Sequence, residues 1–306
     1  MLQRWNEKTH ALEPLGTLPA SGWVHAAAPG AEERKALEAA GIAPALLAYA
    51  LDPDEVARVD HDGACALVVL RVPAPGNGDG VPFRTTTLGV IFREGLVVTV
   101  SAGGAELAAA LAARQGLDPS RTNRFVLNLV GVCAANYLAH LRDIERAVDT
   151  LEEELEASLR NREVLGLLKY QKALVHFTTG LEANELMLSR LPKDARFAVS
   201  AEDQALLEDA QVELRQALQM TRITEEILSQ MMDAFASIIS NNLNVVMKVL
   251  TALTVVLTFP TMVASFYGMN VDLPLQHHPL AFFFVLLGSF TVAGAVAFFF
   301  WRKRWL

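Results

Sequence analysis

The sequence predicts a membrane protein with an α/β domain at its N-terminal end, followed by a long stalk helix and two transmembrane helices at its C-terminal end. Short segments rich in Val, Leu and Ile alternate with helical ones over residues 1–118. No Pro or Gly interrupts residues 201–259. Residues 249–271 and 273–301 contain no Asp, Glu, Lys or Arg, although the whole chain carries a net charge of −8. A hydrophobic content of 52% excludes a disordered chain.

The N-terminal segment, residues 1–118, has the pattern of a small cytosolic α/β domain. Residues 64–72 and 87–101 are predicted as strands, and the Pro- and Gly-rich sequence PAPGNGDGVP between them predicts a hairpin connection. Residues 32–40 and 105–114 are predicted as helices. The glycines of the connection lack the following helix and the Lys-Ser/Thr pair of a phosphate-binding loop, so we interpret them as a turn.

Residues 119–200 are predicted to form a helical hairpin. The pattern is helical from residue 121 to 191, with a break near residues 158–161, which gives two long antiparallel helices. Pro192 is expected to end the second helix. Residues 201–267 would then form one stalk helix of ~100 Å at ~1.5 Å per residue. This length exceeds what a small domain needs, so we expect the helix to enter the bilayer.

Two segments are long enough to cross a membrane. Residues 247–267 and 280–301 each match the ~30 Å hydrocarbon core when helical. The basic residues 302–304 directly follow the second segment, which predicts that both termini are cytosolic and that the loop 268–279 lies outside the cell. The first residues contain no apolar core of a secretory signal. We therefore expect a multi-pass protein of the cell (inner) membrane.

A polar seam follows the first transmembrane segment at spacings of 3, 4, 3 and 4 residues. It consists of Thr251, Thr254, Thr258, Thr261 and Ser265, and Asn244 and Met247 extend it toward the cytosol. Two helices cannot enclose an aqueous path alone, so a pore would need an oligomer. The seam by itself suits helix packing and pore lining equally. The Phe-, Val- and Leu-rich second segment suits an outer, lipid-facing helix and leaves the first segment for an inner ring.

The segment Tyr267-Gly268-Met269-Asn270 directly follows the first transmembrane segment and resembles the Gly-Met-Asn signature of the CorA family of magnesium channels. The stretch NVVMKVLT at residues 244–251 resembles the pore entrance of that family, and the basic end WRKRWL is also similar. LDPDE at residues 51–55, LRVP at 70–73 and LGVI at 88–91 resemble its cytosolic domain. The resemblance covers nearly the whole chain and implies a funnel-shaped homopentamer.

The resemblance also implies roles for individual residues. Gly268, Met269 and Asn270 would form a ring at the outer mouth that accepts a hydrated ion, because Mg²⁺ gives up its water reluctantly and neutral oxygens can bond to that water. Thr258 and Thr261 would lie lower on the same path. Met247 and Leu250 match the apolar constriction of the family, and Asp233 matches its regulatory cation-sensing aspartate.

The expected function is passage of divalent cations, Mg²⁺ first and also Co²⁺ or Ni²⁺, into the cytosol down the membrane potential, with gating by cytosolic Mg²⁺. The expected partners are copies of the same chain, the lipid bilayer and the cations, without nucleic acid or an organic cofactor. The stalk segment 201–233 also carries eight acidic residues, which would repel one another in an oligomer unless cations intervened. These are Glu202, Asp203, Glu208, Asp209, Glu213, Glu225, Glu226 and Asp233.

Some features depart from the family pattern and leave alternatives open. Thr258-Phe259-Pro260 stands where many members have Met-Pro, and Asp272 is the single carboxylate of the outer loop. His277 and His278 could coordinate a softer metal, although two adjacent loop histidines are more often simply interfacial polar residues. A ZntB-like Zn²⁺ transporter of the same fold is therefore one alternative. A non-conducting scaffold or sensor is another, whereas an enzyme is not expected, since no nucleophile and base pair is visible.

Overall fold

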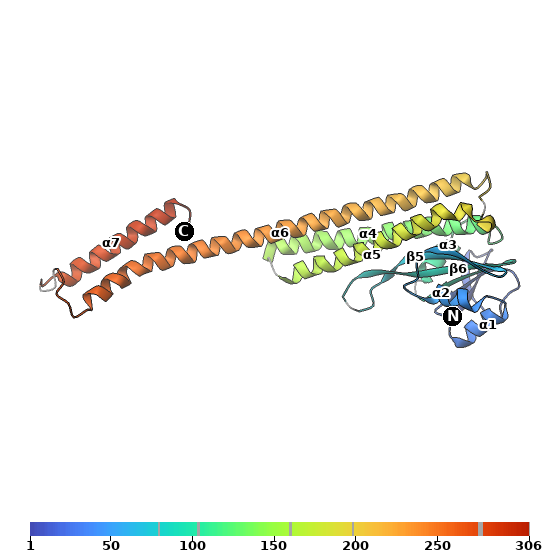
Figure 1. Cartoon of the computed structure of the whole chain (residues 1–306), viewed down its shortest axis with the longest axis horizontal. Helices are drawn as coiled ribbons and strands as arrows, with labels where there is room; N and C mark the ends of the chain where they lie inside the picture. Colours follow the sequence, from blue (N-terminus) through green and yellow to red (C-terminus); the bar gives the residue numbers. More distant parts are fainter. Residues whose placement is uncertain (79, 103–104, 159–160, 198, 275–277, 306) are drawn as a thin grey trace. The chain divides into compact units, whose positions relative to one another are not determined.

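The computed structural model describes residues 1–78, 80–102, 105–158, 161–197, 199–274 and 278–305. The chain divides into two compact units, Met1–Gln230 and Met231–Leu306. Helix α6 (Gln204–Tyr267) contributes residues to both units, and its labelled ribbon can be followed in Figure 1. Each unit is described separately.

The first unit is built on a seven-stranded sheet of order β2-β1-β3-β7-β6-β5-β4 within the described residues. Neighbouring strands are antiparallel except for β3 and β7, which run parallel. The strands are β1 (Leu2–Asn6), β2 (Ala11–Pro14), β3 (Gly22–Ala27), β4 (Arg58–Asp62), β5 (Cys65–Pro75), β6 (Phe83–Arg93) and β7 (Leu96–Ser101).

The predicted hairpin is confirmed as the β5–β6 pair, in which Arg71 lies opposite Thr87. The prediction of one strand over residues 87–101 is wrong, because the chain turns at Glu94 and Gly95 and continues as β7. Gly95 has a φ of +76°, a left-handed conformation that glycine adopts without steric cost. The continuous apolar character of both strands concealed this two-residue turn.

Helices cover both faces of the sheet. On one face lie α1 (Ala31–Ala39) and α2 (Pro44–Leu51), whose Leu37, Leu46 and Leu47 join a buried cluster with residues of β3, β5, β6 and β7. On the other face lie α3 (Ala105–Ala112), α4 (Thr122–Ser158) and α5 (Asn161–Arg190) (Figure 1). The predicted helices over residues 32–40 and 105–114 are confirmed within two residues, and the structure adds α2.

The helical hairpin has its break where it was predicted, since α4 ends at Ser158 and α5 begins at Asn161. After α5, Pro192 lies in a short 3₁₀ turn, Leu191–Lys193. The prediction that the stalk helix begins at residue 201 is wrong by three residues, because α6 begins at Gln204. The carbonyl of Asp203 accepts the N–H of Leu207 at 3.0 Å, which makes Asp203 the cap of this helix.

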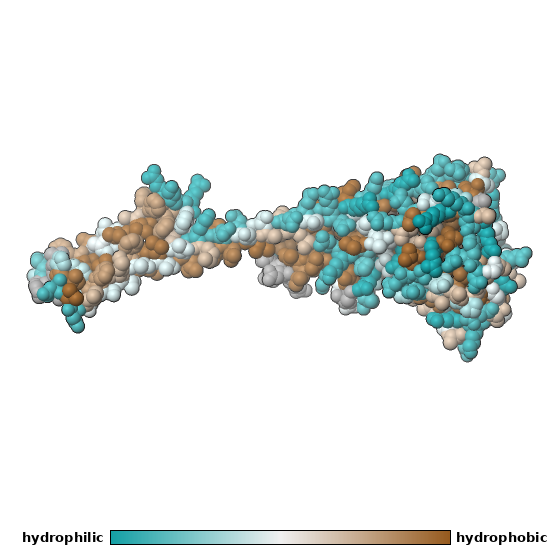
Figure 2. Space-filling model, viewed as in Figure 1, coloured by the Kyte–Doolittle hydropathy of each residue, from teal (hydrophilic) through white to brown (hydrophobic). Residues whose placement is uncertain are grey.

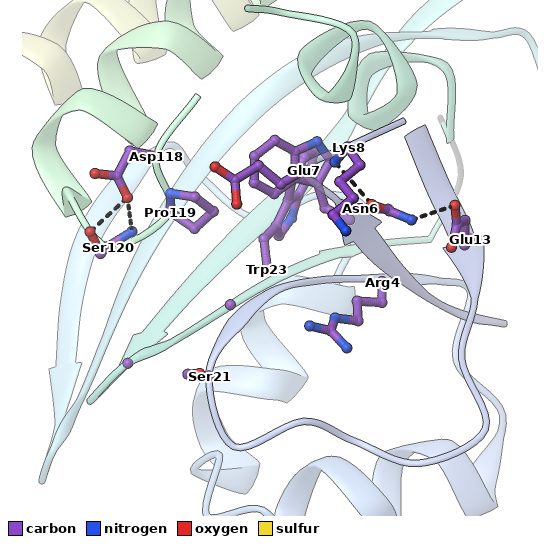
Figure 3. Close-up of a pocket in the computed structure, with 13 residues that line it drawn as sticks. Arg4, Asn6, Glu7, Lys8, Glu13, Ser21, Trp23, Asp118, Pro119 and Ser120 are labelled. Carbon is purple, nitrogen blue, oxygen red and sulfur yellow. Dashed lines mark hydrogen bonds between the residues drawn. The ribbon is translucent and has the colours of Figure 1, made fainter. Parts of the chain in front are cut away.

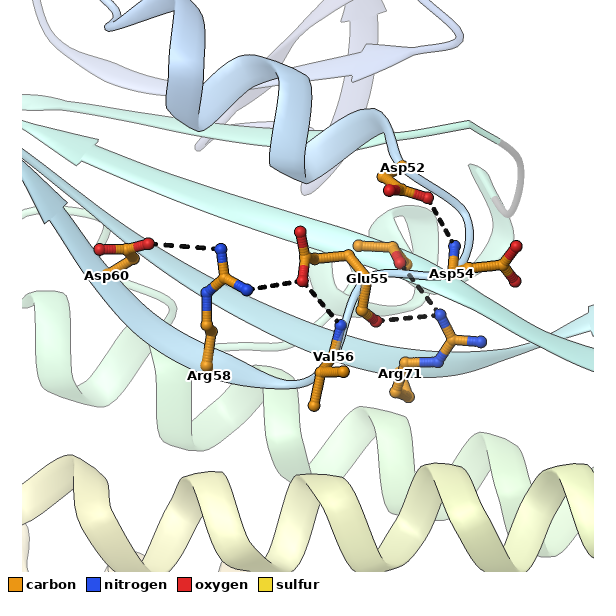
Figure 4. A network of polar contacts seen from close by, with 8 residues as sticks. Asp52, Asp54, Glu55, Val56, Arg58, Asp60 and Arg71 are labelled. Carbon is orange, nitrogen blue, oxygen red and sulfur yellow. Dashed lines mark hydrogen bonds and ion pairs between the residues drawn. The ribbon is translucent and has the colours of Figure 1, made fainter.

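Arg71 of β5 joins the sheet to α4, to α5 and to the loop after α2, and Figure 4 shows its contact with that loop. Strand β4 pairs with β5 only as far as Val69, so the main chain at Arg71 faces an open strand edge. The Asn184 amide of α5 fills that edge: its Oδ1 accepts the Arg71 N–H at 2.8 Å and its Nδ2 donates to the Arg71 carbonyl at 2.7 Å. The Tyr137 hydroxyl donates to the same carbonyl at 3.1 Å. The Arg71 guanidinium in turn donates to the Glu55 carbonyl at 3.1 Å.

Candidate functional site

The second unit contains most of the apolar surface that the chain leaves uncovered. Three described helices are long and apolar enough to cross a membrane. The apolar window of α4 has a mean hydropathy of 1.2 and is 61% buried, so this helix packs inside the first unit. The windows of α6 and α7 (Ala281–Arg302) reach 1.9 and 2.2 and are only 6% and 11% buried. Figure 2 shows the brown and white surface that these two helices expose, as membrane-spanning helices do.

The membrane part of α6 has two different faces. One face contacts α7 through an apolar groove, which Phe259, Val263 and Tyr267 line together with Val285 and Gly288 of α7. The other face carries the predicted polar seam. A second groove there is lined by Thr254, Thr258, Thr261 and Ser265 with Leu257, Met262 and Phe266.

The two faces point in opposite directions. With 3.6 residues per turn, the mean direction of the four hydroxyl residues lies about half a turn from that of Phe259, Val263 and Tyr267. Packing against α7 of the same chain therefore does not explain the seam. The hydroxyl face is exposed in the single chain and is free for another copy or for water.

The threonine hydroxyls are held in one orientation. Those of Thr254, Thr258 and Thr261 donate to the carbonyls four residues earlier, at 2.8, 2.8 and 2.9 Å. Because a hydroxyl has one hydrogen and two lone pairs, each oxygen keeps acceptor capacity after this bond. The face consequently presents hydrogen-bond acceptors.

The seam continues toward the N-terminal end of α6 through the residues predicted there. Asn244, Met247, Leu250 and Thr251 are all exposed on α6, with 53% of Met247 and 55% of Leu250 accessible. Together with the hydroxyl residues they span about a third of the helix circumference at 3.6 residues per turn. The structure thus brings all eight predicted lining residues to one face of one helix.

The Gly-Met-Asn segment forms a turn that ends α6. The Gly268 N–H donates to the Ala264 carbonyl at 3.0 Å, and the Met269 N–H donates to the Phe266 carbonyl at 3.1 Å. A Cβ on Gly268 would lie 3.4 Å from the Ala264 oxygen, which is an ordinary van der Waals contact. Asn270 is exposed, and its side-chain amide has no hydrogen-bond partner among the described residues.

A contact that the sequence did not reveal closes this loop. The Tyr267 hydroxyl donates to the Pro274 carbonyl at 2.9 Å, which joins the end of α6 to the chain that returns from the Gly-Met-Asn segment. The Tyr267 ring lies in the groove between α6 and α7. No spacing rule links a tyrosine to a carbonyl seven residues later, so only coordinates could reveal the contact.

The histidine pair is only partly described, since His277 lies outside the described residues. His278 Nδ1 accepts the Leu280 N–H at 3.2 Å at the beginning of α7. Its ring lies 5.7 Å from that of Phe284. His278 therefore helps to start the helix. Among the described residues, no group of three or more His, Cys, Asp or Glu side chains could hold a metal ion.

The acidic residues of the stalk segment have different environments. Asp203 is buried, and its carboxylate accepts the Arg124 Nε at 2.6 Å and the Ser200 hydroxyl at 2.8 Å. The hydrogen bond from Arg124 lowers the pKa of Asp203. Glu202 pairs with Arg121 at 3.1 Å. Asp233 differs, because it is exposed and no ion pair joins it to the described residues.

A polar cavity of about 700 Å³ lies in the first unit beside β1 and β3 (Figure 3). Arg4 and Lys8 line it together with acidic residues that serve local turns. The Asn6 amide donates to Glu13 at 2.8 Å, and the Ser120 N–H and hydroxyl donate to Asp118 at 2.9 and 2.6 Å. The Ser120 hydroxyl lowers the pKa of Asp118. This mixture of charges does not favour one class of ionic ligand.

Comparison with known proteins gives consistent relatives over the full chain. The cobalt/magnesium transport protein CorA of Methanocaldococcus jannaschii is 25% identical over 295 residues, covering 93% of this chain and 91% of that protein. The complete structure of the CorA magnesium transporter from M. jannaschii matches with a TM-score of 0.82 at 23% identity, covering 100% of this chain and 98% of that one.

A more distant structure shares the fold alone. The ZntB cytoplasmic domain from Vibrio parahaemolyticus matches with a TM-score of 0.57 at 13% identity, covering 79% of this chain and 97% of that one. The family described as CorA-like Mg²⁺ transporter protein matches residues 20–304. Because this match covers nearly the whole sequence, the chain belongs to the family of CorA-like Mg²⁺ transporter proteins.

Proposed function

We propose that the chain assembles as a homopentamer and conducts hydrated Mg²⁺ through the membrane into the cytosol. One observation carries this proposal: a continuous face of hydroxyl oxygens on α6 is turned away from α7 and leads to the Gly-Met-Asn turn. The M. jannaschii relatives, a cobalt/magnesium transport protein and a magnesium transporter, support the choice of ion.

The polar face favours neighbours. The three threonine hydroxyls bond to their own helix, but their remaining lone pairs gain no hydrogen bond from lipid, and two helices cannot enclose water between them. Several copies of α6 that turn this face toward a common axis would remove it from lipid and enclose a path. Five is the number that resemblance to the family implies, and α7, with its apolar surface, would lie outside the ring.

Hydrated Mg²⁺ suits such a lining. The ion keeps its inner water molecules, whose hydrogens point outward, so a selective path must offer acceptors. Thr254, Thr258 and Thr261 offer oxygen lone pairs after donating their hydrogens to the helix. The unpartnered Asn270 amide would offer its oxygen at the outer mouth. Co²⁺ and Ni²⁺, with similar hydrated forms, would share this path.

Gating would occur at the cytosolic end. Rings of exposed Met247 and Leu250 would form an apolar constriction that excludes water when the helices approach one another. Exposed Asp233 would bind cytosolic Mg²⁺ between neighbouring copies and hold the closed arrangement. A divalent ion gains about 2 × 2.3 kcal/mol per 100 mV of inside-negative potential, which drives uptake without a nucleotide.

A matched pair of variants tests the pore lining. Thr258→Val removes an acceptor from the seam, whereas Thr291→Val removes an exposed hydroxyl of α7 that donates to the Leu287 carbonyl at 2.7 Å. In proteoliposomes loaded with a Mg²⁺ indicator, Thr258→Val should slow uptake at least about fivefold, since one hydrogen bond contributes ~1 kcal/mol. Thr291→Val should leave uptake unchanged. Equal rates in the two variants would refute the assignment of the lining.

The same proteoliposomes distinguish the ions. We expect Mg²⁺ and Co²⁺ uptake that follows the membrane potential and does not need a pH gradient. Zinc uptake that needs a proton gradient, with no passage of Mg²⁺, would instead favour the ZntB-like alternative. His278 gives that alternative little support, because it already bonds to the main chain of α7.

A cellular test separates a channel from a non-conducting scaffold. A strain deficient in magnesium uptake should grow at low Mg²⁺ with the unaltered chain and should fail to grow with Asn270→Ala. Immunoblotting of membranes verifies that both proteins are present in equal amounts. Rescue of growth by both proteins would show that the Asn270 side chain is not part of the ion path.

A further inference from the structure

The end of α7 forms an ordered turn beyond the last helical residue. The Trp305 N–H donates to the Phe300 carbonyl at 3.0 Å, and the Arg304 N–H donates to the Trp301 carbonyl at 3.0 Å. This pair of bonds defines the Schellman type of helix end, in which glycine usually occupies the left-handed position. Here that residue is Arg304, with a φ of +56°. The chain thus places a cation where the backbone favours glycine.

Aromatic side chains accompany this turn. The Trp305 ring stacks on that of Phe300, with centroids 5.4 Å apart and planes inclined by 20°. Trp301 lies 5.9 Å from Phe298 and remains 65% exposed. Tryptophan rings with an apolar body and a polar N–H favour the boundary between hydrocarbon and headgroups. The end of α7 therefore has the aromatic composition of a helix end at that boundary.

Three cations surround the turn. Arg302, Lys303 and Arg304 are consecutive and exposed, and none forms an ion pair with a described residue. Residues 231–306 contain only two acidic side chains, Asp233 and Asp272, so the side chains of their unit offer little negative charge. Figure 2 shows hydrophilic side chains where the apolar surface of α7 ends. The orientation of a membrane helix requires only that positive charge lies near its end. Here, in addition, a hydrogen-bonded turn orders the backbone of the three basic residues between two tryptophans.

We propose that this turn, formed by residues 301–305, is a binding site for the phosphate headgroups of anionic phospholipids. The guanidinium and ammonium groups would bind the phosphate, while Trp301 and Trp305 lie against the upper acyl chains. The flanking tryptophans favour a lipid over a soluble phosphate, because only a lipid supplies both chemistries. The proposal needs α7 to span the membrane but does not need the chain to conduct ions.

Tryptophan quenching by brominated lipids tests the proposal on the full-length protein. The chain has four tryptophans, and Trp5 and Trp23 are buried in the first unit, with 8% and 1% accessible. Quenching by bromine on acyl chains therefore reports on Trp301 and Trp305. Brominated phosphatidylglycerol in phosphatidylcholine should quench more strongly than brominated phosphatidylcholine in phosphatidylglycerol at the same mole fraction. Equal quenching would overturn the proposal.

Variants identify the groups responsible. Replacing Arg302, Lys303 and Arg304 by Gln should abolish the preference for the anionic lipid, and replacing both arginines by Lys should retain it. A preference that survives the three Gln substitutions would overturn the proposal. If that variant does not reconstitute, Arg304→Gln alone should lower the association constant for phosphatidylglycerol relative to phosphatidylcholine roughly fivefold. This factor is the contribution of one basic residue near an anionic surface. An unchanged ratio would overturn the proposal.

Inorganic phosphate distinguishes the two sources of the anion. Added at constant ionic strength, it should leave the difference between the two lipids unchanged. Loss of that difference would assign the turn to soluble phosphate and overturn the proposal of a lipid site.

Discussion

Replacement of Asn184 by Leu should destabilise the first unit by about 2–4 kcal/mol. The amide is fully buried and bonds both to the N–H and to the carbonyl of Arg71, at 2.8 and 2.7 Å. Without it the buried N–H has no described acceptor, which costs ~1–3 kcal/mol, and the carbonyl loses one of its bonds, which costs ~1 kcal/mol. Leucine has a similar volume, so lost hydrogen bonds dominate the change.

Urea unfolding of the detergent-solubilised protein measures this effect. Fluorescence of the buried Trp5 and Trp23 reports on the first unit. The matched control is Tyr137→Phe, which removes the hydroxyl bond of 3.1 Å to the Arg71 carbonyl while Asn184 still satisfies that group. This variant should lose only about 1 kcal/mol. A loss for Asn184→Leu no larger than that for Tyr137→Phe would refute the reasoning.

Three further measurements test other parts of the molecule. Gly89→Ala should cost ~1–3 kcal/mol in urea unfolding, because the new Cβ would lie 2.3 Å from the Ala50 Cβ; full stability would show that α2 can shift. Burial lowers the pKa of His25 to about 4 from 6.5. The free energy of unfolding should therefore be highest above pH 6.5 and should fall by up to about 3 kcal/mol toward pH 4, because the unfolded state binds the proton more readily. The variant His25→Leu should lack this pH dependence. Tyr267→Phe, which removes the bond to Pro274, should raise the half-saturating Mg²⁺ concentration about fivefold; an unchanged value would exclude a positioning role.

The long helices were the most predictable part of the fold, because periodicity accumulates over many residues. The short strands were harder. Strand β4 (RVDHD) and strand β2 (ALEP) are polar segments at the edges of the sheet and lack the alternation that identifies a strand. Helix α2 (PALLAYAL) is apolar nearly all round, so it gave no amphipathic signal. Both kinds of element depend on neighbours that are distant in the sequence.

The polar seam was predictable from spacing, but its direction was not. The seam alone left packing and pore lining with equal weight, and the composition of the second segment favoured the inner ring only slightly, since the face that α7 contacts depends on tertiary structure. The groove of Phe259 and Val263 against Val285 decides that α7 lies on the opposite face. The roles of Asp233 and Asn270 stay predictions. The contact of Tyr267 with Pro274 had no signal in the sequence.

The internal hydrogen bonds of the threonines have a consequence for species other than metal ions. Because the hydrogens of Thr254, Thr258 and Thr261 are committed to the helix main chain, these three side chains have no hydroxyl hydrogen to donate. Chloride and sulfate need donors to replace their hydration and would find none at these three positions. A proton relay needs hydroxyls that accept on one side and donate on the other, and these hydroxyls cannot do so without breaking the helix bonds. In the proposed pore, these three positions would therefore favour species that arrive with their own hydrogens, and they would disfavour anions there without any fixed negative charge.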